Sequence, residues 1–376
     1  MIYLDYTANT PASRHVLDTF VETETHCIGN ANSNHQAGQL TNQYIERSTE
    51  RIRELLHLSD TDEIIYTSGA TESNNLAIKG IAQADRHVGH HIISTSLEHS
   101  SVSASLTALQ MQGYEIDLCP MDRHGKIDLE ELEDMIREDT CLVSISAVDS
   151  ELGIVQPVKE VQDIVRKYPD CRLHIDATQA VGKIPFDFSP GDTISFAPHK
   201  FYGLNGIGVL IRHNNIPITP QMSGGKSTTI YRSGTPAAGL ISSIVPALED
   251  VFDHMEDSLT YVSSLRDDLY EQLSAYSEVR INSTDDSIPY IVNLSIDGYK
   301  GADMQKYLDE KGICVSVKSA CSSDLLPSKA VMTIYRNKKR AYEAFRVSLS
   351  PLTTKEEIHA FTDAIDNLLR KELHES

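Results

Sequence analysis

Short apolar segments alternate with longer amphipathic segments through the first two thirds of this chain. Several of the intervening segments, such as 70–84, 100–112 and 158–168, have the length and apolar spacing of helices. The predicted strands span residues 63–67, 91–95, 115–119, 141–147, 172–176, 193–196 and 208–212. Strands separated by helices of this length favour a mostly parallel, doubly wound sheet. We therefore expect an α/β fold whose large domain contains a mostly parallel seven-stranded sheet.

The pattern changes near residue 235, where a helical stretch begins that runs towards residue 277. The elements predicted after it are strands near 290–296 and 345–350 and helices over 302–311 and 354–373. A chain of 376 residues is too long for one small core, so we expect a large domain and a smaller one. We predict an N-terminal arm over 1–15 that packs with the small domain, a large domain over 16–240 and a small α+β domain over 241–376.

The composition is acidic, with a net charge of −21 from 33 basic and 54 acidic residues. A surface of this kind repels phosphate backbones, which argues against a nucleic-acid partner. No apolar run reaches the ~18 residues that a membrane span needs, and the first residues lack the pattern of a secretion signal. The six cysteines contain no CxxC pair, which argues against a disulfide framework and against a zinc site. We expect a cytoplasmic protein without a membrane partner or a bound metal.

Residues 67–73, with the sequence TSGATES, place a turn of small residues between a predicted strand and a predicted helix. The first turn of a helix has amide groups without intrahelical partners and the positive end of the helix dipole, which suits a phosphate. Ala70 and Thr71 lie in this turn, where the Thr71 hydroxyl can add a hydrogen bond. An ordinary capped helix start has the same appearance, so this segment alone leaves both interpretations open.

Two further residues follow predicted strands in positions that favour chemistry. Asp176 closes the strand 172–176, and active-site groups of open α/β sheets gather at such strand ends. A carboxylate there can pair with a pyridinium nitrogen, although this segment taken alone favours an aspartate that caps a helix. Lys200 follows the strand 193–196 and precedes a glycine-bearing segment, 203–208. Burial lowers the pKa of a lysine and frees its amine to attack an aldehyde, whereas a solvated Lys beside a turn is the alternative.

A phosphate turn, an aspartate at a strand end and a later lysine occur in the order expected of a fold-type I enzyme that uses pyridoxal 5′-phosphate (PLP). The chain resembles the cysteine desulfurases of the class V aminotransferase group along essentially its whole length. The segments that carry the resemblance include TSGATES (67–73), EH (98–99), ELG (151–153), HIDATQ (174–179), HK (199–200), RSGT (232–235), SACSS (319–323) and RVSL (346–349). The resemblance implies a large PLP-binding domain and a smaller C-terminal domain.

The resemblance implies roles around the cofactor ring. Lys200 would bind PLP as a Schiff base, and Asp176 would pair with the pyridine nitrogen and keep it protonated. His99 would stack on the ring and take part in proton transfer. Gln179 would approach the ring hydroxyl. Lys200 and His99 are therefore two of the expected catalytic residues.

The resemblance also implies roles at the phosphate and at the substrate. Ala70, Thr71 and His199 would bind the phosphate. Thr235 would reach the phosphate of a neighbouring subunit, which implies a homodimer. Arg346 would bind the carboxylate of the substrate, because a guanidinium offers paired donors to a planar anion.

Cys321 is the expected sulfur acceptor. It lies in a small, polar stretch typical of an exposed loop, whereas most of the other cysteines lie in apolar segments. A nucleophilic thiol must be accessible and at least partly ionised. The resemblance implies that the Cys321 thiolate takes the sulfur of L-cysteine as a persulfide, leaves L-alanine, and passes the sulfur to an acceptor protein.

Several positions depart from the usual pattern of the family, and they include the following three. Ser150 stands where an asparagine is usual, Ala197 where a serine is usual, and Lys318 where a glycine is usual. None of these replaces an expected catalytic residue, but they change the phosphate site, the substrate site and the loop of Cys321. Two alternatives therefore stay open. The first is a selenocysteine lyase or another PLP-dependent lyase or aminotransferase, and the second is a catalytically degenerate scaffold with this fold.

Overall fold

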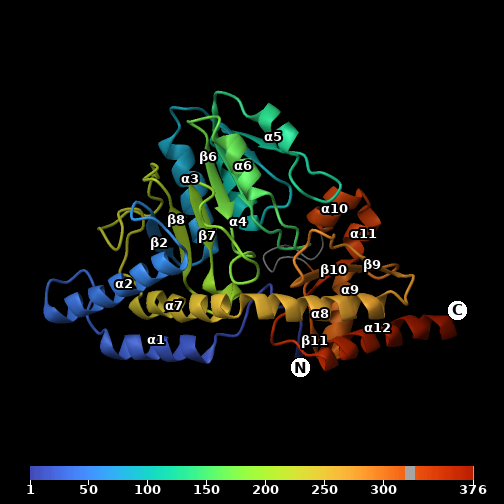
Figure 1. Cartoon of the computed structure of the whole chain (residues 1–376). Helices are drawn as coiled ribbons and strands as arrows, with labels where there is room; N and C mark the ends of the chain where they lie inside the picture. Colours follow the sequence, from blue (N-terminus) through green and yellow to red (C-terminus); the bar gives the residue numbers. More distant parts are fainter. Residues whose placement is uncertain (318–326, 376) are drawn as a thin grey trace.

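A seven-stranded sheet forms the centre of the larger part of the molecule (Figure 1). The computed structural model describes residues 1–317 and 327–375. The strand order is β2-β8-β7-β6-β5-β3-β4, in which β8 runs antiparallel to both neighbours and the other neighbouring pairs are parallel. The strands are β2 (Glu63–Thr67), β3 (His91–Ser94), β4 (Glu115–Leu118), β5 (Thr140–Ser146), β6 (Arg172–Asp176), β7 (Thr193–Phe196) and β8 (Gly208–Arg212). The predicted α/β fold with a mostly parallel seven-stranded sheet is confirmed.

Apolar side chains pack on both faces of this sheet. In β2, Ile65 belongs to one buried cluster, whereas Ile64 and Tyr66 belong to another. Successive side chains of a strand point to opposite faces, so these two clusters lie on opposite sides of the sheet. The helices of this part are α1 (Arg14–His26), α2 (Gln36–Leu55), α3 (Ala70–Ala84), α4 (Ser100–Gln110), α5 (Leu129–Met135), α6 (Val158–Val165) and α7 (Ala238–Asp253).

The C-terminal part contains a three-stranded antiparallel sheet in the order β12-β10-β9. The helical stretch expected from residue 235 to 277 is interrupted at His254, and its two parts, α7 and α8, run end to end along one side of the molecule (Figure 1).

Strand β1 of the N-terminal arm pairs with β11, so the arm lies against the C-terminal part. The elements not yet given are β1 (Ile2–Tyr3), α8 (Met255–Leu273), β9 (Val279–Ile281), β10 (Ile291–Ile296), α9 (Gly301–Glu310), β11 (Ile313–Cys314), α10 (Lys329–Tyr335), α11 (Lys338–Glu343), β12 (Ala344–Ser348) and α12 (Lys355–Glu375). The exact division into an arm and two domains stays a prediction. No helix in the described part of the chain is both long and apolar enough to cross a membrane.

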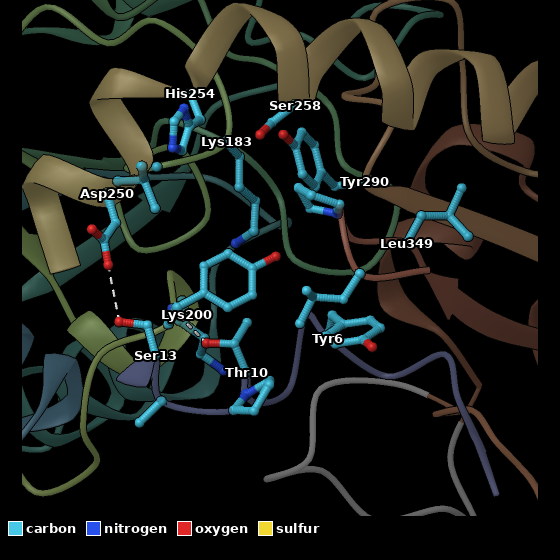
Figure 2. Close-up of a pocket in the computed structure, with 17 residues that line it drawn as sticks. Tyr6, Thr10, Ser13, Lys183, Lys200, Asp250, His254, Ser258, Tyr290 and Leu349 are labelled. Atoms are coloured by element: carbon cyan, nitrogen blue, oxygen red, sulfur yellow. Dashed lines mark hydrogen bonds between the residues drawn. The ribbon is translucent and has the colours of Figure 1, made fainter. Parts of the chain in front are cut away.

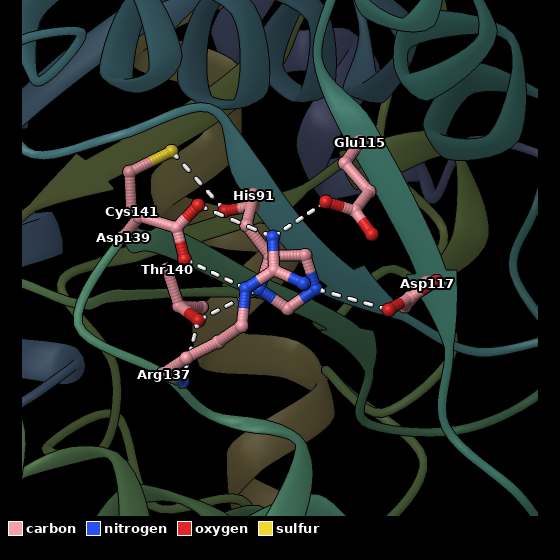
Figure 3. A network of polar contacts seen from close by, with 7 residues as sticks. All are labelled: His91, Glu115, Asp117, Arg137, Asp139, Thr140 and Cys141. Carbon is pink, nitrogen blue, oxygen red and sulfur yellow. Dashed lines mark hydrogen bonds and ion pairs between the residues drawn. The ribbon is translucent and has the colours of Figure 1, made fainter.

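A polar network joins the amino-terminal ends of β3, β4 and β5 (Figure 3). Arg137 donates to Glu115 of β4 at 2.5 Å and to Asp139 at 2.6 Å, and His91 of β3 contacts Thr140 of β5 at 2.7 Å. The arginine pairs are exposed, so each contributes only about 0–1 kcal/mol. The network lies at the amino-terminal ends of these strands, and the candidate site lies at the opposite, carboxyl-terminal ends.

Candidate active site

A cavity of about 310 Å³ lies at the carboxyl-terminal ends of the central parallel strands. We call it the strand-end cavity. The strand ends contribute Ser146 of β5 and Asp176 of β6, and the turn after β7 contributes Lys200. The carboxyl ends of parallel strands meet at one edge of a sheet, which is why residues far apart in sequence gather here. Its lining includes the predicted residues Ala70, Thr71, His99, Asp176, Gln179, His199 and Lys200.

The amino-terminal end of α3 forms one wall of the cavity. Gly69 is the N-cap and has no side-chain capping bond, so the first amide groups of α3 are available to an anion. Gly208 at the start of β8 packs directly on this turn, and a Cβ atom at Gly208 would lie 2.3 Å from the carbonyl carbon of Gly69. Glu72 accepts from the Ser68 amide at 2.7 Å and pairs with Arg232 at 2.9 Å, which neutralises its charge beside the turn. The turn therefore has the form of a phosphate site.

Asp176 is buried at the end of β6 and is held by two donors. Its Oδ2 accepts from Nδ2 of Asn74 at 2.7 Å, and its Oδ1 accepts from the amide of Thr178 at 3.0 Å. Asn74 lies on α3 and is in turn fixed by His174, whose Nε2 lies 3.0 Å from Oδ1 of Asn74, and by a short bond from Ser195. Both carboxylate oxygens thus have a partner that fixes the orientation of the group at the floor of the cavity.

His99 precedes α4 and lines the cavity in a defined tautomer. Its Nδ1 accepts from the backbone amide of Ser101 at 3.2 Å and lies 2.8 Å from the Ser101 hydroxyl. An acceptor Nδ1 places the proton of the neutral ring on Nε2. Burial is the largest cause that lowers the pKa of His99, and Asp176 acts against it. The ring is therefore neutral near pH 7, with an N–H donor at Nε2.

The segment around Lys200 is held by the N-terminal arm. Lys200 Nζ donates to the backbone carbonyls of Thr7 at 2.9 Å and Ala8 at 2.7 Å. Thr10 donates from its amide and from its hydroxyl to the carbonyl of His199, each at 2.9 Å. Burial, followed by the charges of Lys200 and Lys183, lowers the pKa of His199 to about 4. The His199 ring is therefore uncharged near pH 7. Figure 2 shows Lys200 from the other side, where a second cavity of about 420 Å³ adjoins it.

Two predicted residues lie outside the lining of the strand-end cavity. Arg346 is buried in β12, where it donates to the carbonyl of Ser150 at 2.7 Å and pairs with Asp5 at 3.0 Å. Its Nε has no hydrogen-bond partner among the described residues. Thr235 lines a smaller hollow beside Ser68. The substrate-binding and inter-subunit roles of Arg346 and Thr235 stay predictions.

The departures from the family pattern are placed only in part. Ser150 lines the strand-end cavity, and its carbonyl anchors Arg346. Ala197 is fully buried behind the Lys200 turn. Cys321 and Lys318 lie outside the described residues.

Asn74 and Ser101 belong to the site as well, although neither was expected there from the sequence. Asn74 donates to Ser101 at 2.8 Å as well as to Asp176, so one amide links the supports of Asp176 and His99. The signal in the sequence is an asparagine within α3 among small and apolar residues, but polar residues are common in helices. Its importance follows from the contact between α3 and β6, which the sequence does not show.

Glu98, next to His99, provides a test of the electrostatics around the site. It accepts from Thr95 at 2.7 Å and from the Ser146 amide and hydroxyl at 3.1 and 2.7 Å. Burial, and to a lesser extent Asp176, raises the pKa of Glu98 to about 7 from its ordinary 4.5. Between about pH 4.5 and pH 7, the folded protein keeps a proton on Glu98 that the unfolded chain has lost. The free energy of unfolding therefore falls as the pH rises through this range.

We expect Glu98→Gln to weaken that pH dependence, because a neutral amide avoids the cost of an ionised buried carboxylate. When the pH rises from 5 to 8, the free energy of unfolding of wild type should fall by roughly 2 kcal/mol more than that of the variant. Urea unfolding at both pH values measures this difference. The exposed Glu160→Gln is the control and should follow wild type. An equal pH dependence in wild type and Glu98→Gln would contradict the assignment.

The fold and the strand-end cavity together define a fold-type I PLP-dependent enzyme. The family model described as Aminotransferase class-V matches residues 2–361, and the chain belongs to this family, whose enzymes depend on PLP. The predicted family is thereby confirmed.

Individual relatives match nearly the whole chain. "Cysteine desulfurase IscS" of Salmonella paratyphi C is 37% identical over 373 residues, which cover 97% of this chain and 91% of the relative. A solved structure titled "NIFS-LIKE PROTEIN" has a TM-score of 0.91 at 32% identity and covers 98% of this chain and 99% of its own. A structure titled "SspA in complex with cysteine" has a TM-score of 0.81 at 28% identity and covers 94% and 100% of the two chains.

Proposed function

We propose that this chain is a PLP-dependent cysteine desulfurase that converts L-cysteine to L-alanine and passes the sulfur to Cys321 as a persulfide. The observation that carries the proposal is the strand-end cavity, which gathers Lys200, Asp176, His99 and the start of α3. It does so in a chain that aligns along nearly its full length with a relative named cysteine desulfurase.

The residues of the cavity fit PLP. The amide groups of Ala70 and Thr71 suit the phosphate, and the oriented carboxylate of Asp176 suits the pyridine nitrogen. Thr178 lines the cavity, and its buried hydroxyl has no hydrogen-bond partner among the described residues. When bound, PLP supplies an electron sink for the reaction.

The amine of Lys200 and the ring of His99 handle protons in this proposal. Lys200 attaches the cofactor in the resting enzyme, and as a free amine it can take or return a proton at Nζ. His99 presents an N–H at Nε2, because its Nδ1 is occupied by Ser101. The side chain of Asp176 lies at the cavity floor, where a carboxylate stabilises a protonated pyridine nitrogen.

Cys321 and Arg346 complete the proposed reaction. The Cys321 thiolate attacks the sulfur of L-cysteine, so the carbon–sulfur bond breaks and a sulfur–sulfur bond forms. Arg346 binds the substrate carboxylate. Its Nε has no hydrogen-bond partner among the described residues, so this N–H can donate to the carboxylate. Ser150 lines the strand-end cavity, and its carbonyl accepts a hydrogen bond from this arginine.

We also propose that the chain acts as a cytoplasmic homodimer that donates sulfur to an acceptor protein. Thr235 lies beside the α3 turn, on the surface of a small hollow with Ser68 and Arg232. A partner subunit placed against this hollow brings its own Thr235 towards a phosphate. The net charge of −21 favours an acceptor with a basic surface.

The test is a stoichiometric assay of the PLP-loaded protein with L-cysteine, L-selenocysteine and L-cysteine sulfinate. We expect a visible absorbance band after PLP is added, a change in that band with L-cysteine, and equal amounts of alanine and sulfide under reducing conditions. Turnover of selenocysteine alone would replace the proposal with a selenocysteine lyase. A protein that stays colourless with added PLP would instead indicate a degenerate scaffold.

A further inference from the structure

Lys183 is a buried lysine that the reaction described above does not use. Its side chain is 5% exposed, and it lines the second cavity, on the opposite side of the cofactor-attaching lysine (Figure 2). Its Nζ donates to Oε1 of Gln179, four residues earlier in the chain, at 2.7 Å. Burial of a lysine costs free energy, so a buried lysine whose hydrogen-bond partner among the described residues is one amide oxygen points to a specific purpose.

Gln179 is the residue expected to approach the oxygen on the PLP ring, and its amide must present a donor there. An amide has an oxygen that only accepts and a nitrogen that only donates, so its orientation decides what it offers. Nε2 of Gln179 donates one hydrogen to the backbone carbonyl of Thr7 at 3.2 Å. Because Lys183 donates to Oε1, both ends of the amide are set, and the second hydrogen of Nε2 is left for the strand-end cavity, which Gln179 lines.

We propose that Lys183 is a positioning residue that holds the Gln179 amide with Nε2 towards the ring oxygen of PLP. This inference rests on the proposed function only in requiring bound PLP. Lys183 acts through its hydrogen bond and not through its charge. In support, burial, followed by Lys200 and Arg346, keeps the pKa of Lys183 well below its ordinary value.

The visible absorbance of the PLP-loaded protein gives a readout that is independent of turnover. Its colour depends on a proton shared between the ring oxygen and the nitrogen that joins PLP to Lys200. An N–H donated to the ring oxygen stabilises the deprotonated form, so loss of that donor raises the pH midpoint of the colour change. One hydrogen bond of ordinary strength corresponds to a shift of about 0.5–1 pH unit.

The experiment is a double-mutant cycle with Lys183→Met, Gln179→Leu and the double variant, each titrated as the PLP-loaded protein. We expect both single variants to raise the midpoint by about 0.5–1 unit, and the double variant to match Gln179→Leu. Lys183→Arg, which keeps a donor at this position, should keep the wild-type midpoint. Thermal unfolding of each variant shows that it is folded.

Two results would overturn the inference. An unchanged midpoint in Lys183→Met would show that Gln179 needs no support. A shift of the midpoint by Lys183→Met that is equally large in wild type and in Gln179→Leu would show that Lys183 acts by its charge. If Lys183→Met does not fold, a shifted midpoint in Lys183→Arg would likewise overturn it. A wild-type protein that binds PLP and makes no alanine would overturn the proposed function alone, because the titration requires only the bound cofactor.

Discussion

Replacing Lys200 by alanine is expected to abolish the covalent attachment of PLP and to lower kcat by at least about 10²–10⁴-fold, the range typical of a lost general acid–base group. Lys200 Nζ lies within the strand-end cavity and is held at 2.9 and 2.7 Å by the carbonyls of Thr7 and Ala8. The variant loses the amine that bonds to the cofactor and the group that moves the proton. Borohydride reduction of the PLP-loaded protein, followed by mass spectrometry of its peptides, measures the attachment.

Lys183→Met is the matched control for this experiment, since Lys183 is a buried lysine that lines the second cavity together with Lys200. The control variant should keep PLP covalently attached to the peptide that contains Lys200. Reduced cofactor found on Lys183, or found on the protein after Lys200→Ala, would show that the assignment of Lys200 is wrong. Thermal unfolding of Lys200→Ala separates loss of the amine from loss of the fold.

Replacing Cys321 by alanine is expected to bring sulfide release from L-cysteine below about 1% of the wild-type rate, while PLP remains bound. The reactive form of a cysteine is the thiolate. Burial raises the pKa of Cys119 and of Cys141 to about 12, so at pH 8 roughly one molecule in 10⁴ carries either thiolate. Burial also raises the pKa of Cys171. Cys321 lies outside the described residues, and its role rests on the polar segment around it and on the family resemblance.

Cys27→Ala and Cys314→Ala are the controls, because these two thiols are partly accessible in the structure. Burial raises the pKa of both thiols, so neither variant should change the rate by more than about twofold. Sulfide and alanine are measured in the same reaction mixture. Sulfide release that survives in Cys321→Ala and disappears in either control would assign the acceptor to another cysteine.

The strands of the central sheet could be predicted from sequence because both faces of the sheet are buried. The predicted strands 63–67 and 172–176, for example, coincide with β2 and β6. Helix α1 was not predicted, because its sequence is rich in threonine and glutamate and its burial depends on packing against α7. The interruption at His254 was also not predicted, since helical periodicity continues through it and only the path of the backbone shows the end of α7.

The residues at the strand ends could be predicted because their order along the chain is itself informative. Asp176 and Lys200 follow predicted strands, and parallel strands bring such residues to one edge. Asn74 could not be found in this way, because its role depends on α3 lying across the ends of β6 and β7. The same holds for Thr7, whose backbone carbonyl contacts Lys200 and Gln179 only because the arm folds back over the sheet.

The sequence by itself determined the class of fold, the order of the chemical groups and the identity of the lysine expected to hold PLP. These properties depend on apolar periodicity and on residue type, which are local. Only the tertiary structure decided the proton positions and orientations within the site: the Nε2 tautomer of His99 and the orientation of the Gln179 amide between Thr7 and Lys183. Both depend on hydrogen bonds, and hydrogen bonds act over about 3 Å between groups whose proximity is created by folding.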